Sequence, residues 1–259
     1  MPLTPIQQLF DQAPVFALVL FRLGGLFALA PLLGSVTIPV KVKVLFVLVL
    51  GFAVFPLVPK TSFVPNSFLH LAVSVGGELL IGITIGFALS LLFVGIQLGA
   101  EMISYQMGLG MARLIDPLSE VSTTALSQFY LLLATLLYVL MGGHLILIRQ
   151  LAGSFQTIPL LSSFQSQPVI KMCLVILREA FELGIRISGP AVVALFLASL
   201  AMGFISRTMP QLNILAAGFP VRTTLGLIML IASLAMVGLL FQNSLALVFK
   251  RVGALFMQL

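Results

Sequence analysis

Charged residues are scarce in this sequence: they make up 8% of its 259 residues, against about 25% in a typical soluble domain. Tryptophan is absent, and there are only one cysteine and two histidines. A single cysteine excludes an internal disulfide. The two histidines lie far apart, so no spacing typical of a metal site is present. Hydrophobic residues reach 60%, and only a membrane protein with several spanning segments fits this composition.

Motifs that would indicate catalysis or nucleic-acid binding are also missing. The sequence contains no Gly-x-Ser-x-Gly elbow, no Walker-type phosphate loop and no His-Glu-x-x-His pair. Its 13 basic residues are spread singly rather than in a tract, which gives no footprint for nucleic acid. We therefore expect a protein that is not an enzyme and that uses no cofactor.

Long apolar segments dominate the chain, separated by turns that contain proline. They cover roughly 12–30, 40–58, 68–106, 122–150, 168–207 and 219–250. One crossing of the ~30 Å hydrocarbon core needs about 20 residues. The third and fifth segments would extend ~58 and ~64 Å as helices. These lengths predict an all-α integral membrane protein built from long kinked helices and helical hairpins.

The distribution of basic residues does not choose an orientation in the membrane. If all six segments cross, the loops carry five basic residues on one side and five on the other. Such a balance fits helices held mainly by protein partners, and it equally fits a membrane protein with a weak orientation signal.

Small residues recur at helical spacing in the third segment, at Gly82, Gly86, Gly95 and Gly99. Such faces let helices approach closely in lipid. The pattern predicts intimate helix packing, either within the chain or with a partner.

Arg22 is an ionisable residue inside an apolar segment, where a charge is costly. A structural ion pair or a contact with carbonyl oxygens is the preferred interpretation, and a transport role is the alternative. Glu78 and Glu101 lie where we expect helix margins.

Two breaks interrupt the apolar pattern. The first, around Gly108, Gly110 and the Asp116-Pro117 step, is either an outside turn or the lining of a pore. The second reads TMPQLNILAAGFP at 208–220 and has proline near both ends. It predicts a re-entrant or buried break, with a surface turn as the alternative.

Three blocks in register resemble the FliR family of flagellar export-gate proteins, called SctT in injectisomes. They are QMGLGMARLIDP at 106–117, GGHLILIRQLAGSFQTIP at 142–159 and RTMPQLNILAAGFP at 207–220. The resemblance covers nearly the whole chain, and the Gly-Phe-Pro at 218–220 favours the flagellar branch.

The resemblance implies a subunit of the flagellar type III protein export gate. Such a subunit completes a helical pore of FliP, FliQ and FliR, through which unfolded flagellar proteins are secreted. Residues 1–210 would form a FliP-like helical part, and residues 211–259 a FliQ-like C-terminal hairpin. Implied partners are FliP-like and FliQ-like subunits, an FlhB-like switch protein and the exported proteins. The implied location is the bacterial inner membrane, in the flagellar basal body.

The resemblance also assigns roles to residues in both breaks. Loop 107–121 would be a plug in the pore, formed by Met107, Gly108, Leu109, Gly110, Met111, Arg113, Asp116 and Pro117. The second break would shape partner packing through Pro210, Gln211, Asn213, Gly218, Phe219 and Pro220. The competing class is a secondary transporter, in which broken helices at 106–121 and 207–220 form a midplane site. These breaks, however, do not fall at matching positions in two halves.

Overall fold

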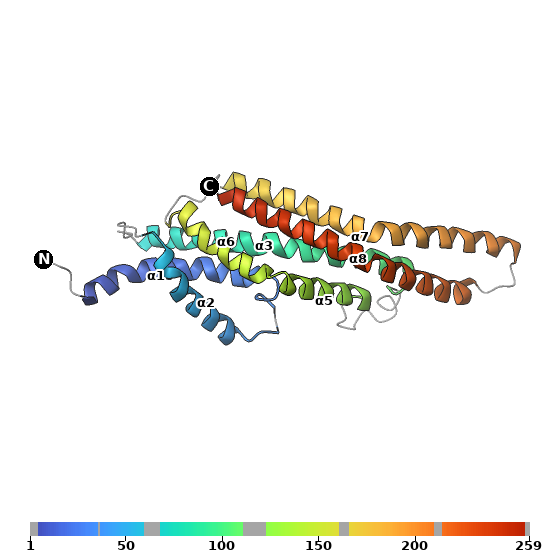
Figure 1. Cartoon of the computed structure of the whole chain (residues 1–259), viewed down its shortest axis with the longest axis horizontal. Helices are drawn as coiled ribbons and strands as arrows, with labels where there is room; N and C mark the ends of the chain where they lie inside the picture. Colours follow the sequence, from blue (N-terminus) through green and yellow to red (C-terminus); the bar gives the residue numbers. More distant parts are fainter. Residues whose placement is uncertain are drawn as a thin grey trace. The chain divides into compact units, whose positions relative to one another are not determined.

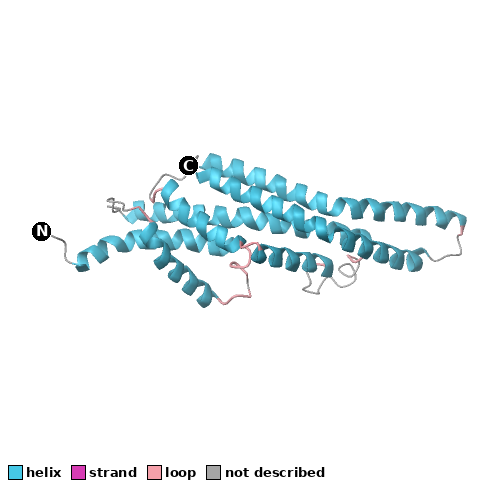
Figure 2. Cartoon of the chain, viewed as in Figure 1, coloured by secondary structure: helices cyan, strands magenta, loops and turns pink. Residues whose placement is uncertain are grey.

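The computed structural model describes residues 5–35, 37–59, 68–110, 123–160, 166–209 and 214–256. The helices are α1 (Pro5–Leu29), α2 (Val40–Val54), η1 (Phe55–Leu57), α3 (Phe68–Met107), α5 (Ala125–Leu140), α6 (Gly143–Thr157), α7 (Ser166–Thr208) and α8 (Ile214–Phe256), as Figure 1 shows. Every regular element in these described ranges is helical (Figure 2). The predicted all-α fold is confirmed.

The apolar composition of these helices makes the chain an integral membrane protein. Four described helical stretches are long and apolar enough to cross a membrane, or up to five if α5 and α6 count as one broken span. A helix suits this setting because it satisfies its backbone hydrogen bonds internally, where lipid offers no partner.

The predicted segment 122–150 is wrong as a single element, because the chain breaks at Gly142 into α5 and α6. Gly142 adopts a left-handed conformation with φ +67°, which glycine takes without the clash that a Cβ would cause. Its carbonyl oxygen accepts hydrogen bonds from the N–H groups of Leu145 and Ile146, at 2.9 and 3.1 Å. Gly142 therefore starts a new helix inside an apolar run.

The expected hairpin within 211–259 is instead one continuous helix, α8. Pro220 lies inside α8 and does not break it, so the second break ends before Ile214. Pro220 is the seventh residue of α8, so the helix continues through it although one i→i−4 hydrogen bond is lost. The antiparallel partner of α8 is α7, and Met202 of α7 would lie 3.8 Å from a Cβ on Gly218.

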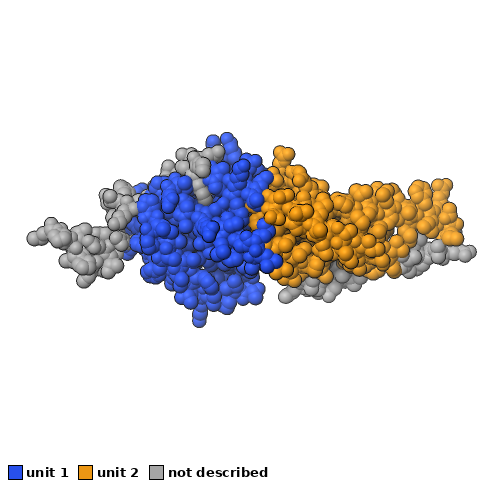
Figure 3. Space-filling model, in the orientation of Figure 1, with its two compact units in different colours: residues 1–91, 139–177, 246–259 blue, residues 92–138, 178–245 orange. Residues whose placement is uncertain are grey.

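The chain divides into two compact units, coloured separately in Figure 3. Unit 1 contains Met1–Leu91, Val139–Leu177 and Ala246–Leu259, and unit 2 contains Leu92–Tyr138 and Arg178–Leu245. Helices α3, α5, α7 and α8 contribute residues to both units.

In unit 1, aromatic and polar contacts join segments far apart in sequence. The Phe16 ring of α1 lies 4.8 Å from that of Phe52 and 5.4 Å from that of Phe55, between ring centroids. The Gln150 Nε2 of α6 donates a hydrogen bond to the Phe249 carbonyl of α8, at 2.6 Å.

In unit 2, an aromatic cluster joins α3 to α5 and α8. The Phe93 ring meets Tyr138 and Phe241 edge to face, with centroids 5.7 and 5.6 Å apart. The Tyr130 hydroxyl of α5 lies 3.5 Å from that of Ser233 in α8. Each edge-to-face pair contributes about 0.5–1.5 kcal/mol beyond its burial.

Candidate functional site

Helices α1 and α3 touch backbone to backbone in unit 1. A Cβ added at Gly82 would lie 2.0 Å from the Arg22 carbonyl oxygen, and one at Gly86 would lie 2.9 Å from that of Leu26. Gly25 of α1 faces α3 in the same way, because its Cβ would lie 2.4 Å from the Leu79 carbonyl oxygen. The structure thus places two of the predicted packing glycines at a crossing within the chain. Gly25 completes this crossing, and sequence reasoning did not single it out.

The same crossing encloses a buried ion pair. The Arg22 side chain is fully buried and that of Glu78 is 3% exposed. The Arg22 Nε donates to Glu78 Oε2, and Nη1 donates to the Ser154 Oγ at 3.1 Å. Nη2 donates to the Ile158 carbonyl oxygen at 3.2 Å, and the guanidinium carbon lies 4.3 Å from the centre of the Phe155 ring.

In this arrangement Arg22 has a structural role, because it links three parts of the chain. The planar guanidinium offers five N–H donors in a fixed fork, and here the fork contacts α3, α6 and the residue that follows α6. The charged guanidinium donates to both a carboxylate and a carbonyl oxygen, so the predicted ion pair or carbonyl contact is confirmed. The position of Glu78 differs from the expected helix margin, since it lies well inside α3.

A second close crossing, between α3 and α7, lies in unit 2. A Cβ at Gly95 would lie 2.4 Å from the Ala180 carbonyl oxygen, and one at Gly99 would lie 2.7 Å from that of Gly184. A Cβ added at Gly184 would in turn lie 2.8 Å from the Gly95 carbonyl oxygen. A glycine on each helix is needed here because the two backbones leave no room for side chains.

The predicted plug loop begins where Gly108 ends helix α3. Gly108 has φ +85°, and its N–H bonds to the Tyr105 carbonyl oxygen at 3.1 Å. The Leu109 N–H bonds to the Ser104 carbonyl oxygen at 3.0 Å. These two bonds form the Schellman motif, which ends a helix with a left-handed glycine.

The two ends of that loop are joined by a buried hydrogen bond. The hydroxyl oxygens of Ser104, in the last turn of α3, and Thr124, just before α5, lie 2.9 Å apart. Thr124 also caps α5, since its Oγ1 accepts the Ser127 N–H at 3.3 Å. The end of α3 and the start of α5 are therefore held together. We call Ser104, Met107, Gly108 and Thr124 the loop base.

Helix α8 packs onto the loop base. Met107 is 1% exposed, and a Cβ at Gly226 would lie 2.5 Å from its Cγ. Ring atoms of Phe219 lie 3.4 and 3.7 Å from a Cβ on Gly108. Met107 therefore belongs to helix α3 and its core, whereas the sequence placed it in the plug.

The remaining predicted site residues fall into two sets. Leu109 and Gly110 lie in the turn after α3. Met111, Arg113, Asp116, Pro117, Pro210, Gln211 and Asn213 lie outside the described residues. Their assignments stay predictions.

The described residues offer no group of three histidine, cysteine, aspartate or glutamate side chains that could hold a metal ion.

Replacing Thr124 with valine should destabilise the protein by roughly 2 kcal/mol. The helix cap contributes about 1 kcal/mol, and an unpaired buried Ser104 hydroxyl costs about 1–3 kcal/mol. Thermal unfolding of the detergent-purified protein measures the effect. Thr124→Ser keeps the hydroxyl and should behave as wild type; equal losses in both variants would contradict the role of the hydrogen bond.

Comparison with known proteins adds what geometry alone does not give. Residues 13–248 match the family model described as bacterial export proteins, family 1. The chain is 31% identical to the flagellar biosynthetic protein FliR of Escherichia coli (strain K12) over 222 residues, covering 84% of this chain and 83% of that protein. It is 27% identical to the FliR of Bacillus subtilis (strain 168) over 243 residues, covering 92% of this chain and 93% of that one. The FliR of Aquifex aeolicus (strain VF5) is 29% identical over 225 residues, 86% of each chain. The chain therefore belongs to bacterial export proteins, family 1, the FliR family.

Proposed function

We propose that this chain is a subunit of the flagellar type III protein export gate. It would complete a FliP/FliQ/FliR helical pore in the bacterial inner membrane, within the flagellar basal body. The family match over residues 13–248 and the relatives named as flagellar biosynthetic proteins support this function. The same match favours the export gate over the transporter alternative.

The observation that carries the pore role is the loop base. The Ser104–Thr124 hydrogen bond joins the end of α3 to the start of α5, so a change within residues 111–122 should leave both helices in place. Their sequence offers Met111, Leu114 and Ile115 as apolar surface. An apolar segment blocks ions by excluding water, and methionine adapts to irregular gaps. We assign this segment as the plug.

Exposed apolar residues of α8 supply a surface for partner subunits. Val221, Ile228, Ile231 and Leu239 are all exposed, and their spacing places them along one side of the helix. A hollow of about 370 Å³ lies at the start of this stretch, lined by Pro220, Val221, Thr224, Leu225 and Ile228. We propose that a FliQ-like subunit packs here, with residues 1–210 meeting FliP-like neighbours. An FlhB-like switch protein would then contact the assembled gate.

Shortening the plug should open a leak without preventing assembly. Residues 112–120 are replaced with a shorter glycine-serine linker, which keeps the loop base and hence the folds of α3 and α5. The altered chain is produced together with FliP-like and FliQ-like subunits. We expect the complex to co-purify as wild type does, and ion flux across vesicles that contain it to rise several-fold.

One control variant and two contradicting outcomes complete this experiment. Met111→Leu preserves apolar volume and should keep the vesicles tight. Vesicles that stay tight with the shortened loop would refute the plug, whereas a wild-type chain that fails to co-purify with these subunits would refute the export-gate function.

A further inference from the structure

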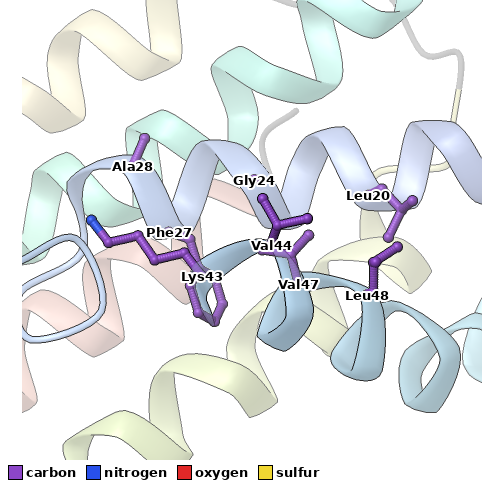
Figure 4. Close-up of a pocket in the computed structure, with 8 residues that line it drawn as sticks. All are labelled: Leu20, Gly24, Phe27, Ala28, Lys43, Val44, Val47 and Leu48. Carbon is purple, nitrogen blue, oxygen red and sulfur yellow. The ribbon is translucent and has the colours of Figure 1, made fainter. Parts of the chain in front are cut away.

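An apolar groove of about 340 Å³ lies between α1 and α2 in unit 1. Ligand sites commonly have volumes of about 300–1,000 Å³. The groove is lined by Leu20, Gly24, Phe27, Ala28, Lys43, Val44, Val47 and Leu48, shown in Figure 4. Of these, Ala28, Val44 and Leu48 are exposed, so the groove opens at the protein surface.

The floor of the groove owes its depth to Gly24. A Cβ added there would meet no heavy atom within 4 Å. The next glycine, Gly25, is pressed against α3, so the two glycines lie on different faces of α1. The space above Gly24 is not required for packing α1 on α2, because the Phe16–Phe52 ring contact already joins these helices.

One end of the groove is cationic and the other is apolar. The Lys43 amino group lies toward Ala28, while Leu20 and Leu48 close the opposite end (Figure 4). Among the described residues, Lys43 Nζ donates one hydrogen bond, to the Gly34 carbonyl oxygen at 3.0 Å. An ammonium group has three donors, so that bond fixes its position and leaves two N–H groups for an anion.

We propose that this groove binds an anionic phospholipid, with an acyl chain along α1 and the phosphate on Lys43. From Leu20 to Ala28 the helix advances ~12 Å, which gives an extended hydrocarbon chain a continuous apolar bed. Lys41, two residues before Lys43 in the first turn of α2, is exposed and adds positive charge at this end of the helix. Anionic lipid headgroups are drawn to lysines placed at the membrane surface.

The character of α2 favours lipid as the occupant. Residues Val40–Leu57 form one of the stretches apolar enough to cross a membrane, and Leu45, Val49 and Phe52 are all more than half exposed. Its lysines fall in the first turn, where a spanning helix meets the headgroups.

The first test fills the groove. Gly24→Leu places a side chain in the open space, and leucine is a better helix former than glycine, so the fold should persist. The full-length protein is purified in detergent and given phosphatidylglycerol or phosphatidylcholine with identical acyl chains. Native mass spectrometry counts retained lipid. Wild type should retain phosphatidylglycerol preferentially, and Gly24→Leu should lose most of it.

The second test removes the charge. Lys43→Gln should lower retention of phosphatidylglycerol by about fivefold, the share expected of one lysine, and leave phosphatidylcholine unchanged. The matched controls are Gly153→Leu, at another helical glycine with open space above it, and Lys171→Gln, at an exposed lysine of α7. Both controls should bind as wild type does.

A lipid carrying a photoreactive acyl chain gives an independent readout that does not depend on any variant. It should label peptides containing residues 20–28 and 43–48 in membranes. Equal retention by wild type and Gly24→Leu, or equal retention of the two lipids by wild type, would overturn the proposal. Capture of another protein chain by a Val44→Cys variant in the Cys173→Ser background, in place of lipid labelling, would overturn it as well.

Discussion

Glu78→Leu should cost the protein about 3–5 kcal/mol, the range for removing one partner of a buried ion pair. The loss arises because the Arg22 guanidinium, which is fully buried, keeps its charge and loses the only carboxylate that it contacts in the described structure. The remaining acceptors, Ser154 Oγ and the Ile158 carbonyl oxygen, carry no charge to offset it. We expect a lower unfolding temperature in detergent and a smaller yield of folded protein.

The double variant Arg22→Met/Glu78→Leu measures how much the intact ion pair contributes to stability, separately from the destabilisation caused by leaving one charge unpaired. It removes both charges and keeps apolar volume, and such exchanges are often neutral. The Ser154 hydroxyl stays satisfied, because it also donates to the Leu151 carbonyl oxygen at 2.6 Å. The double variant should therefore be clearly more stable than Glu78→Leu. A double variant that shows the summed losses of the two single variants would contradict a direct charge pair.

The helices that sequence predicted best are those with uninterrupted apolar runs. The segment expected at 68–106 is α3, Phe68–Met107, because its run is strongly apolar and contains no proline. The break at Gly142 escaped prediction because hydropathy does not register a left-handed backbone. Pro220 was wrongly taken as a break, because the start of α8 four residues after Pro210 was not visible in the composition.

The site was less predictable than the fold, because its contacts join distant parts of the sequence. Arg22 stood out as a charge in an apolar run, but Glu78 lies 56 residues away and Ser154 lies 132 residues away. Similarly, Ser104 and Thr124 are ordinary polar residues until α3 and α5 bring their hydroxyls together. Spacing identified the small face of Gly82 and Gly86, whereas the identity of the opposing helix came only from the structure.

Two glycines of α3 should respond to the same substitution with opposite signs. In Gly82→Ala, the new Cβ would lie 2.0 Å from the Arg22 carbonyl oxygen and 2.9 Å from the Leu26 backbone nitrogen. Backbone cannot rotate away as a flexible side chain does, so α1 and α3 must separate. Overpacking of this kind costs about 1–3 kcal/mol, occasionally more, and we expect about 3 kcal/mol because the Arg22 contacts move with α1.

Gly76→Ala is the matched control on the same helix. A Cβ there meets no heavy atom within 4 Å, so alanine should stabilise the helix by about 0.5–1 kcal/mol through its lower backbone entropy. Thermal unfolding of the two variants under identical detergent conditions therefore reports the crossing itself, since the chemical change is the same in both. Equal unfolding temperatures for Gly82→Ala and Gly76→Ala would contradict the close approach of α1 and α3 at Gly82. The helix crossing would then not be what positions the buried Arg22–Glu78 pair.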